Sequence, residues 1–565
     1  MTTLSLNITC TEGGTAGNVI ANRLSENPDY SVLVIEAGGS NVDVVDITVP
    51  FYGPRAVPDT PQDWNYTTTP QVNLNGRSLA YPRGFVLGGS SSVNDMVYTR
   101  GSKEDFDRFA RVTGDEGWTW DSLVPYMRMN ERFSPPVDHH NATDQFNPAV
   151  HGFSGIDAVS LAGFPTSIDS RVIETTTESK EFPFNLDMNS GYQLGIGWVQ
   201  TTIKNGSRSS SATSYLASEF IASRPSLNVL LHARVTRVLQ SGLKTFRTVE
   251  LVQDINGKRF TLTAKKEVIL SAGTIGTPSI LLHSGIGNSS TLTSLGIEPL
   301  HDLPSVGQNL SDHALVALSW LVNSNDTFET AGRNTTLAEE EFDQWNTTRT
   351  GPLVDTPTSH LGWLRIARDE DSTSIFEDFP DPAAGPNTSH YEFVVSNGFV
   401  GPTPPTGNFL TITVALVSPL SRGTVTLNSS DPLSAPLINP NFLDHELDVF
   451  ILRAAIRSAM RFVATPAWAN YIISPVDVNV NATDAELDEY IHNKAGAVYH
   501  PVGTASMSPK GASYGVVDPD LRVKGLSGLR VVDISVAPFI PAAHTQAPTY
   551  FIAERAAYLV KEYWN

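Results

Sequence analysis

The order of hydrophobic and polar positions near the N-terminus predicts a strand–helix–strand unit. Residues 16–24 place Val19, Ile20 and Leu24 on one face of a helix. Residues 31–35 form a continuous apolar run, which is typical of a buried parallel strand. The segment before the helix, residues 4–10, alternates apolar and polar positions and so does not show this solid pattern. The pattern favours an α/β fold at this end of the chain.

Further elements are predicted along the rest of the chain. Two apolar stretches near residue 420 are expected to pair as antiparallel strands joined by residues 418–422. We find no internal repeat and no low-complexity linker, so the first and last segments are expected to share one domain. The predicted strands cover residues 229–238, 267–271, 410–417, 423–427 and 529–532, and the predicted later helices lie within residues 273–287 and 549–562.

Composition and charge exclude several classes of function. The 565 residues include 38 Lys and Arg against 59 Asp and Glu, which gives a net charge of -21. An acidic surface of this kind argues against binding to nucleic acid and to anionic membranes.

The single cysteine, Cys10, permits no intramolecular disulfide, and no spacing of ligand residues suggests a metal site. The longest uncharged stretch, residues 534–553, contains three prolines, so no membrane-spanning helix is expected.

The chain is rich in sequons for N-glycosylation. The N-terminus has no basic residue and no apolar core, so it does not resemble a signal peptide. Two interpretations of the many sequons stay open. They can arise by coincidence in a chain rich in Ser and Thr, or the protein is a secreted, extracellular glycoprotein whose signal peptide is missing from this chain. We take secretion as the working expectation. The sequons begin at Asn7, Asn65, Asn141, Asn205, Asn288, Asn309, Asn325, Asn334, Asn346, Asn387, Asn428 and Asn481.

A glycine-rich turn precedes the first helix. Gly14 and Gly17 supply the second and third glycines of the dinucleotide fingerprint G-x-G-x-x-G. Glu36 stands 19 residues after Gly17, where an acidic residue binds a ribose hydroxyl. The first glycine is replaced by Glu12. On this motif alone, a dinucleotide site and a glycine-rich turn without a ligand are both open.

A second loop, residues 84–94, is rich in glycine and serine. Its residues Gly88, Gly89 and Ser90 could present backbone N–H groups to a phosphate. An ordinary flexible loop is the alternative interpretation.

Five spaced motifs in this order resemble the glucose–methanol–choline (GMC) family of flavin oxidoreductases, and the fungal aryl-alcohol oxidases within it. Residues 84–107 are similar to the first signature of the family, except at Phe85, where Arg or Lys is usual. Residues 273–287 match the second signature. The other family landmarks are residues 306–313, 419–423 and 500–504, and the aryl-alcohol oxidase stretches are residues 63–69, 114–118, 418–419, 505–509 and 544–546.

The resemblance implies an α/β fold with an α+β substrate part. A doubly wound FAD-binding domain would be interleaved with a substrate domain built on an antiparallel sheet. We expect a mainly FAD-binding N-terminal module over residues 1–315 and a substrate-domain segment over 316–415. A C-terminal module over 416–565 would complete the substrate sheet and return to the FAD domain.

The resemblance also implies FAD as the cofactor. Some family members attach FAD through a His in the first-signature region, and Asn94-Asp95 offers none, so we expect noncovalent FAD. The residues that the resemblance assigns to FAD are Gly14, Gly17, Glu36, Gly88, Ser90, Asn94, Val235, Asp533 and Thr545.

Two histidines near the C-terminus match the catalytic positions of the family. His500 would take the hydroxyl proton of an alcohol while flavin N5 takes the hydride, and His544 would position the alcohol oxygen. The expected function is oxidation of a primary aryl, allylic or similar alcohol to the aldehyde, with O2 reduced to H2O2. The expected partners are a small-molecule alcohol and O2 or another acceptor, and the protein is expected to be a monomer. The alternatives are a dehydrogenase of secondary metabolism that uses an acceptor other than O2, or a flavin-deficient homologue.

Two departures from the aryl-alcohol oxidases lead to further hypotheses. In the substrate pocket Tyr499 keeps an aromatic residue, but Asp95 replaces an expected Tyr, and Val400 beside Phe399 replaces an expected Phe. We therefore expect a primary alcohol other than simple benzyl alcohol, such as an allylic or terpenoid alcohol. Glu12 places a side chain and a negative charge beside an anionic pyrophosphate, so we expect this chain to bind FAD poorly.

Overall fold

A five-stranded parallel sheet joins the two ends of the chain. In the computed structural model, which describes residues 7–254, 256–366 and 375–564, its strand order is β24-β13-β1-β2-β9. Every neighbouring pair in this sheet is parallel. The strands are β1 (Ile8–Thr11), β2 (Val32–Ile35), β9 (Leu227–Leu230), β13 (Glu267–Leu270) and β24 (Leu529–Val531).

The central strand β1 is buried on both faces. All four of its residues are buried, including the polar Thr9 and Thr11. The alternation in its sequence therefore reflects two threonines in the interior rather than a face in contact with solvent. Their methyl groups and β-branched shape suit a strand, and the backbone pairs with β2 and β13 on either side.

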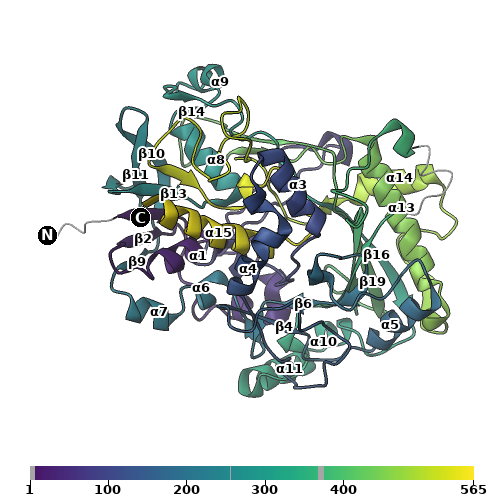
Figure 1. Cartoon of the computed structure of the whole chain (residues 1–565). Coiled ribbons are helices and arrows are strands. Elements are labelled where there is room, and N and C mark those ends of the chain that lie inside the picture. Colours follow the sequence, from purple (N-terminus) through teal and green to yellow (C-terminus); the bar gives the residue numbers. More distant parts are fainter. Residues whose placement is uncertain (1–6, 255, 367–374, 565) are drawn as a thin grey trace.

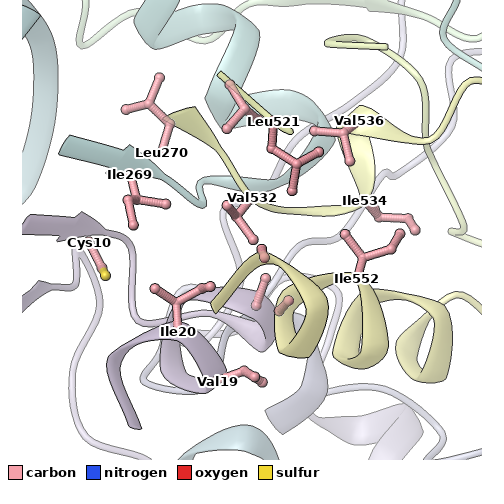
Figure 2. Close-up of a cluster of buried hydrophobic side chains, with 14 of the residues drawn as sticks. Cys10, Val19, Ile20, Ile269, Leu270, Leu521, Val532, Ile534, Val536 and Ile552 are labelled. Carbon is pink, nitrogen blue, oxygen red and sulfur yellow. The ribbon is translucent and has the colours of Figure 1, made fainter. Parts of the chain in front are cut away.

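Two helices cover one face of this sheet. Helix α1 (Thr15–Leu24) packs along the C-terminal helix α15 (Gln546–Trp564), and α4 (Trp120–Asn130) packs against α15 from outside (Figure 1). Ile20 of α1 points toward Cys10 and Ile269 on the strands, and Ile552 of α15 lies beside Ile534, which follows β24 (Figure 2). The predicted first and last helices are thus confirmed, and burial of their apolar faces explains why both ends of the chain share one core.

A three-stranded antiparallel sheet packs against strands β13 and β24 of the parallel sheet. It consists of β10 (Arg234–Gly242), β11 (Thr245–Val252) and β12 (Arg259–Thr263), and β11 contacts β13 and β24. The prediction of one strand over residues 229–238 was wrong, because this segment divides between β9 and β10. His232 adopts a left-handed conformation with φ +54, which interrupts the extended chain and starts the second sheet.

A second, seven-stranded sheet forms the other half of the molecule, and all of its pairings are antiparallel. Helix α13 (Glu446–Val463) covers one face, where Phe462 packs on Phe393 with ring centroids 6.0 Å apart. The expected combination of a parallel α/β core with an antiparallel sheet is confirmed. The order is β22-β16-β19-β18-β17-β5 with β23 beside β16, and the strands are β5 (Gly195–Trp198), β16 (Ala314–Val322), β17 (Thr358–Leu364), β18 (Tyr391–Ser396), β19 (Phe409–Leu416), β22 (Ile472–Pro475) and β23 (Gly496–Ala497).

The strand predicted over residues 423–427 exists but has a different partner. It is β20 (Thr424–Thr426), and it pairs with β21 (Leu437–Asn439) rather than with β19 as predicted. The cause is the carboxylate of Asp448 on α13, which accepts hydrogen bonds from the backbone N–H groups of Leu420 and Ser421 at 2.8 and 2.9 Å. These bonds hold residues 418–422 against α13, so the chain does not fold back along β19.

The remaining elements surround these two sheets, and none of the helices in the described part of the chain has the length and apolarity needed to cross a bilayer. The other helices are α2 (Val45–Thr48), α3 (Lys103–Thr113), α5 (Asp169–Glu178), α6 (Ser211–Ser214), α7 (Ser218–Ser223), α8 (Gly273–His283), α9 (Ser289–Ser294), α10 (Glu329–Arg333), α11 (Thr335–Thr348) and α14 (Asp484–Lys494). The short strands are β3 (Glu131–Phe133), β4 (Asp157–Leu161), β6 (Gln200–Thr201), β7 (Ile203–Lys204), β8 (Ser207–Arg208), β14 (Ile286–Gly287) and β15 (His301–Asp302).

Candidate active site

A cavity of about 410 Å3 begins at one edge of the parallel sheet and extends to the histidines near the C-terminus. Four of its lining residues come directly after the carboxyl ends of parallel strands: Glu12 after β1, Glu36 after β2, Ser271 after β13, and Asp533 just after β24. Ligands of open α/β sheets bind outside this edge. The topology therefore makes this cavity the candidate site.

The two glycine-rich loops meet at the start of the cavity. A Cβ on Gly89, whose φ is +53, would lie 2.9 Å from Gly14 Cα, and a Cβ on Gly17 would lie 2.2 Å from Glu12 O. Only glycine permits these approaches. Gly14 and Ser90 line the cavity, whereas Gly17 and Gly88 support the loops from behind.

Glu12 is the unusual residue at this end of the cavity. Its φ is +72, the left-handed conformation that a glycine adopts freely, and its side chain lies in the cavity with that of Glu36. Burial raises the pKa of Glu12 to about 7, although Arg234 acts in the opposite direction. Burial, and then the charge of Glu12, raises the pKa of Glu36 well above its usual value. The two carboxyl groups thus oppose each other's ionisation where a dinucleotide would bind.

Aromatic and unpaired polar groups at the same end indicate a large ligand with many hydrogen-bonding atoms. Trp64 and Tyr66 stack with ring centroids 5.6 Å apart, and the Arg234 guanidinium lies 5.0 Å from the Trp64 ring. Three buried atoms of lining residues have no hydrogen-bond partner among the described residues: Ser271 Oγ, Ser279 Oγ and His283 Nε2. Buried polar groups are seldom left unpaired without a ligand or water. Apart from Glu12, this end fits a dinucleotide such as FAD.

A hydrogen-bond network fixes the middle of the cavity. Asp533 accepts from Gly273 N at 3.0 Å and from Thr277 Oγ1 at 2.6 Å, and so holds the start of α8. Asn94 donates to Gln546 Oε1 and accepts from Arg208 Nη1. The predicted cofactor residues Glu36, Asn94, Val235, Asp533 and Thr545 all line this cavity, together with Gly14 and Ser90.

The structure brings the two predicted catalytic histidines together. The rings of His500 and His544 have centroids 4.7 Å apart and meet at 72°. His544 Nε2 lies 2.9 Å from Glu392 Oε1, and its backbone N–H donates to Thr99 Oγ1. Glu392 is buried in β18, where side chains alternate between faces, so that it faces the histidines while Phe393 faces α13.

A buried carboxylate and a third histidine orient His500. Asp312 accepts from the backbone N–H of His500 at 2.7 Å and from the Tyr81 hydroxyl at 2.5 Å. His500 Nδ1 lies 3.1 Å from His313 Nδ1. When His500 donates in this contact, its Nε2 carries the lone pair that accepts a proton. Burial lowers the pKa of His500 well below its usual value, and the nearby His544, His313 and Arg83 act in the same direction, so the ring is uncharged near pH 7.

The four residues expected in the substrate pocket separate into two groups. Asp95 and Tyr499 line the cavity beside the histidines. Phe399 and Val400 do not belong to the described lining residues, since Val400 is 51% exposed and Phe399 packs on Phe409 with ring centroids 5.4 Å apart. The expectation that they belong to the substrate pocket therefore does not match their position, which lies outside the described lining of the cavity.

Sequence reasoning did not identify His313, Glu392 and Arg234 as parts of the site. His313 ends the family landmark over residues 306–313, so its motif gave a signal that we did not use. Glu392 and Arg234 lie in ordinary strand sequences. Only the folded structure reveals that their side chains reach the cavity region.

Comparisons with known proteins agree with this geometry. Two GMC oxidoreductase family models match, the N-terminal one over residues 8–315 and the C-terminal one over residues 419–553. Pyranose dehydrogenase 3 of Leucoagaricus meleagris is 43% identical over 97% of this chain and 91% of its own length. Formate oxidase of Aspergillus oryzae RIB40, described for modification of its FAD, has a TM-score of 0.91 at 30% identity and covers 100% of this chain and 99% of its own. A fungal aryl-alcohol oxidase has a TM-score of 0.87 at 25% identity, with 99% of each chain covered.

The position of Glu12 generates a prediction about cofactor affinity. Glu12→Gly removes the carboxylate from the cavity and is expected to tighten FAD binding by roughly tenfold, measured by quenching of FAD fluorescence. Because a carboxyl with a pKa of about 7 ionises as pH rises, the FAD affinity of the unmodified chain should fall between about pH 6 and 8. Glu12→Gln should weaken this fall, since Glu36 alone then titrates. Glu116→Gln, at an exposed position, is the control. Equal FAD affinity in the unmodified chain and the Glu12→Gly variant would contradict the role of Glu12.

Proposed function

The chain belongs to the GMC oxidoreductase family, and on that premise we propose that it oxidises a primary alcohol to the corresponding aldehyde. Membership makes it an FAD-dependent enzyme that acts on CH–OH donors. The observation that carries the proposal is the pair of histidine rings 4.7 Å apart at the end of the cavity. A neutral imidazole beside a positioned second imidazole suits removal of a hydroxyl proton.

Each residue around the histidines has a separate proposed role. His500 takes the hydroxyl proton at Nε2, because His313 engages Nδ1. Glu392 holds Nε2 of His544, which leaves Nδ1 of the same ring to hydrogen-bond the alcohol hydroxyl. Asp95 and Tyr499 line the same cavity and would border the substrate carbon. Bound FAD supplies the hydride acceptor for the carbon.

The residues that would hold FAD lie along the cavity. Glu36 would bind the ribose, Gly14 and Ser90 the pyrophosphate, and Asp533 with Thr545 the flavin side. We propose that FAD is held noncovalently, because residues 84–95 contain no His, Cys or Tyr to form a bond to it.

We propose O2 as the electron acceptor, with the two electrons and two protons from the alcohol leaving as H2O2. A second candidate is a dehydrogenase that passes the electrons to a quinone or similar acceptor. It is supported by 43% identity to a protein named pyranose dehydrogenase. Both candidates use the same histidines, so the acceptor is the point on which they differ.

We also propose that the protein is a secreted glycoprotein. Asn7 and Asn309 are partly buried and donate hydrogen bonds to the protein, and the other ten sequon asparagines are exposed. Exposure at so many independent sites is what glycosylation of a folded surface requires.

The role of His500 can be tested by flavin reduction. His500→Ala is expected to lower the rate at which cinnamyl alcohol bleaches the flavin by roughly 10²- to 10⁴-fold, because the proton has no acceptor. The measurement is anaerobic stopped-flow absorbance of the FAD-loaded protein, with flavin content checked first. His139→Asn, on an exposed loop, is the control and should react like the unmodified chain. A variant lacking His500 that reduces at the original rate would contradict the proposed base.

The acceptor is tested by product stoichiometry. With O2 as acceptor, each aldehyde formed should be accompanied by one H2O2, measured with peroxidase and a chromogenic dye. Substrate turnover that requires benzoquinone and yields no peroxide in air would instead establish the dehydrogenase.

Glycosylation is tested by expression in a eukaryotic secretory host behind a heterologous signal peptide. Treatment with peptide N-glycosidase F should lower the apparent mass by several glycans, and peptide mapping should find them at exposed sequons such as Asn141, Asn346 and Asn481. An unchanged mass would contradict the proposal.

A further inference from the structure

Asp95 is an unpaired carboxylate in the cavity. It directly follows the glycine/serine loop, lines the cavity and is exposed to it, and no donor hydrogen-bonds to its side chain among the residues that the structure describes. By contrast, the buried carboxylates of Asp312, Asp448 and Asp533 each accept at least two hydrogen bonds. An acceptor that stays free inside a cavity is available to a ligand.

A buried cation stands behind Asp95. Arg208 is only 5% exposed, is fixed through Nε to Ile47 O at 2.7 Å and through Nη1 to Asn94 Oδ1 at 2.8 Å, and leaves Nη2 without a partner. Burial raises the pKa of Asp95, and the charges of Arg208 and then His544 oppose this shift. The negative charge of Asp95 is therefore partly balanced from the protein side. A bound substrate does not have to supply a positive charge, only a hydrogen-bond donor.

Asp95 lies in the part of the cavity near the catalytic histidines, because its neighbour Asn94 donates a hydrogen bond to Gln546, two residues after His544. Asp95, His544 and Tyr499 all line the cavity together with His500. A substrate whose reacting hydroxyl lies between the histidines presents its neighbouring substituents to Asp95. A hydroxyl substituent would donate to the carboxylate, while a methyl or aryl edge would leave the charge without a partner.

We propose that Asp95 is the specificity-determining residue of the site and that it selects alcohols with a second hydroxyl group, so that the substrate is a polyhydroxylated primary alcohol. This inference rests on the function proposed above. It also implies rejection of substrates that carry a carboxylate, because like charges would then meet in the cavity. The identity of 43% to a pyranose dehydrogenase supports the same substrate chemistry.

The test uses a matched pair of substrates of the same shape, benzene-1,4-dimethanol and 4-methylbenzyl alcohol. The FAD-loaded protein is mixed with each under anaerobic conditions, and flavin bleaching is followed as a function of concentration. The unmodified chain should prefer the diol by roughly tenfold or more in the apparent second-order rate constant, since a hydrogen bond to a charged group is worth at least that factor. The preference should lie mainly in the apparent dissociation constant of the substrate rather than in the limiting rate.

Variants at position 95 separate this role from a structural one. Asp95→Leu should abolish the preference while reducing at least as fast with 4-methylbenzyl alcohol, and Asp95→Asn, which keeps a carbonyl acceptor, should retain part of it. Asp343→Asn, on the exposed side of α11, is the matched control and should keep the full preference. Flavin content and the circular dichroism spectrum establish that each variant is folded.

The outcomes distinguish this inference from the proposed function. If both alcohols bleach the flavin equally in the unmodified chain, or if Asp95→Leu keeps the preference for the diol, the role of Asp95 is wrong while alcohol oxidation stands. If the flavin is bound but neither these alcohols nor cinnamyl alcohol bleaches it, the proposed function fails, and the inference about Asp95 fails with it.

Discussion

Parallel pairing in one sheet is the constraint on which the rest of this structure depends. Strands β1, β13 and β24 come from residues 8–11, 267–270 and 529–531, yet they lie side by side in register. Parallel strands end at the same edge, so the residues that follow them meet although hundreds of residues separate them in the chain. The cavity, its two glycine loops and Asp533 all follow from this pairing.

The substrate end depends on a second constraint, which is that buried carboxylates must be paired. Asp312 receives the backbone N–H groups of His313 and His500 and the Tyr81 hydroxyl, and these bonds compensate its burial, which raises its pKa to about 6. The same carboxylate thereby joins three distant segments and fixes the histidine pair. Glu392 does the equivalent for His544. The hydrogen bonds that compensate these two buried carboxylates therefore also hold His500 and His544 in place.

Proteins similar to this chain have different named activities, and side chains that line the cavity of a shared fold can account for such differences. A formate oxidase, an aryl-alcohol oxidase and a pyranose dehydrogenase resemble this chain over nearly its whole length. Proteins that share one fold can differ in activity, because the fold fixes the framework of the cavity without fixing the side chains that surround the substrate. In this chain the surroundings include a carboxylate, Asp95, where an aromatic residue was expected. The selectivity that we propose for this chain depends on this single position.

The sequence by itself determined the family and the position of the two glycine loops, and it singled out His500 and His544, which the structure brings together, because these signals are local motifs with a chemically specific residue at a fixed spacing. From hydrophobic patterns it also predicted strands β2, β13, β19, β20 and β24 and helices α1, α8 and α15. Only the tertiary structure decided that β20 pairs with β21, that Phe399 lies outside the described lining of the cavity, and that Glu392 faces His544. These features depend on contacts between segments far apart in the chain. Such contacts are set by the burial of apolar faces and the pairing of buried polar groups, which no local pattern records.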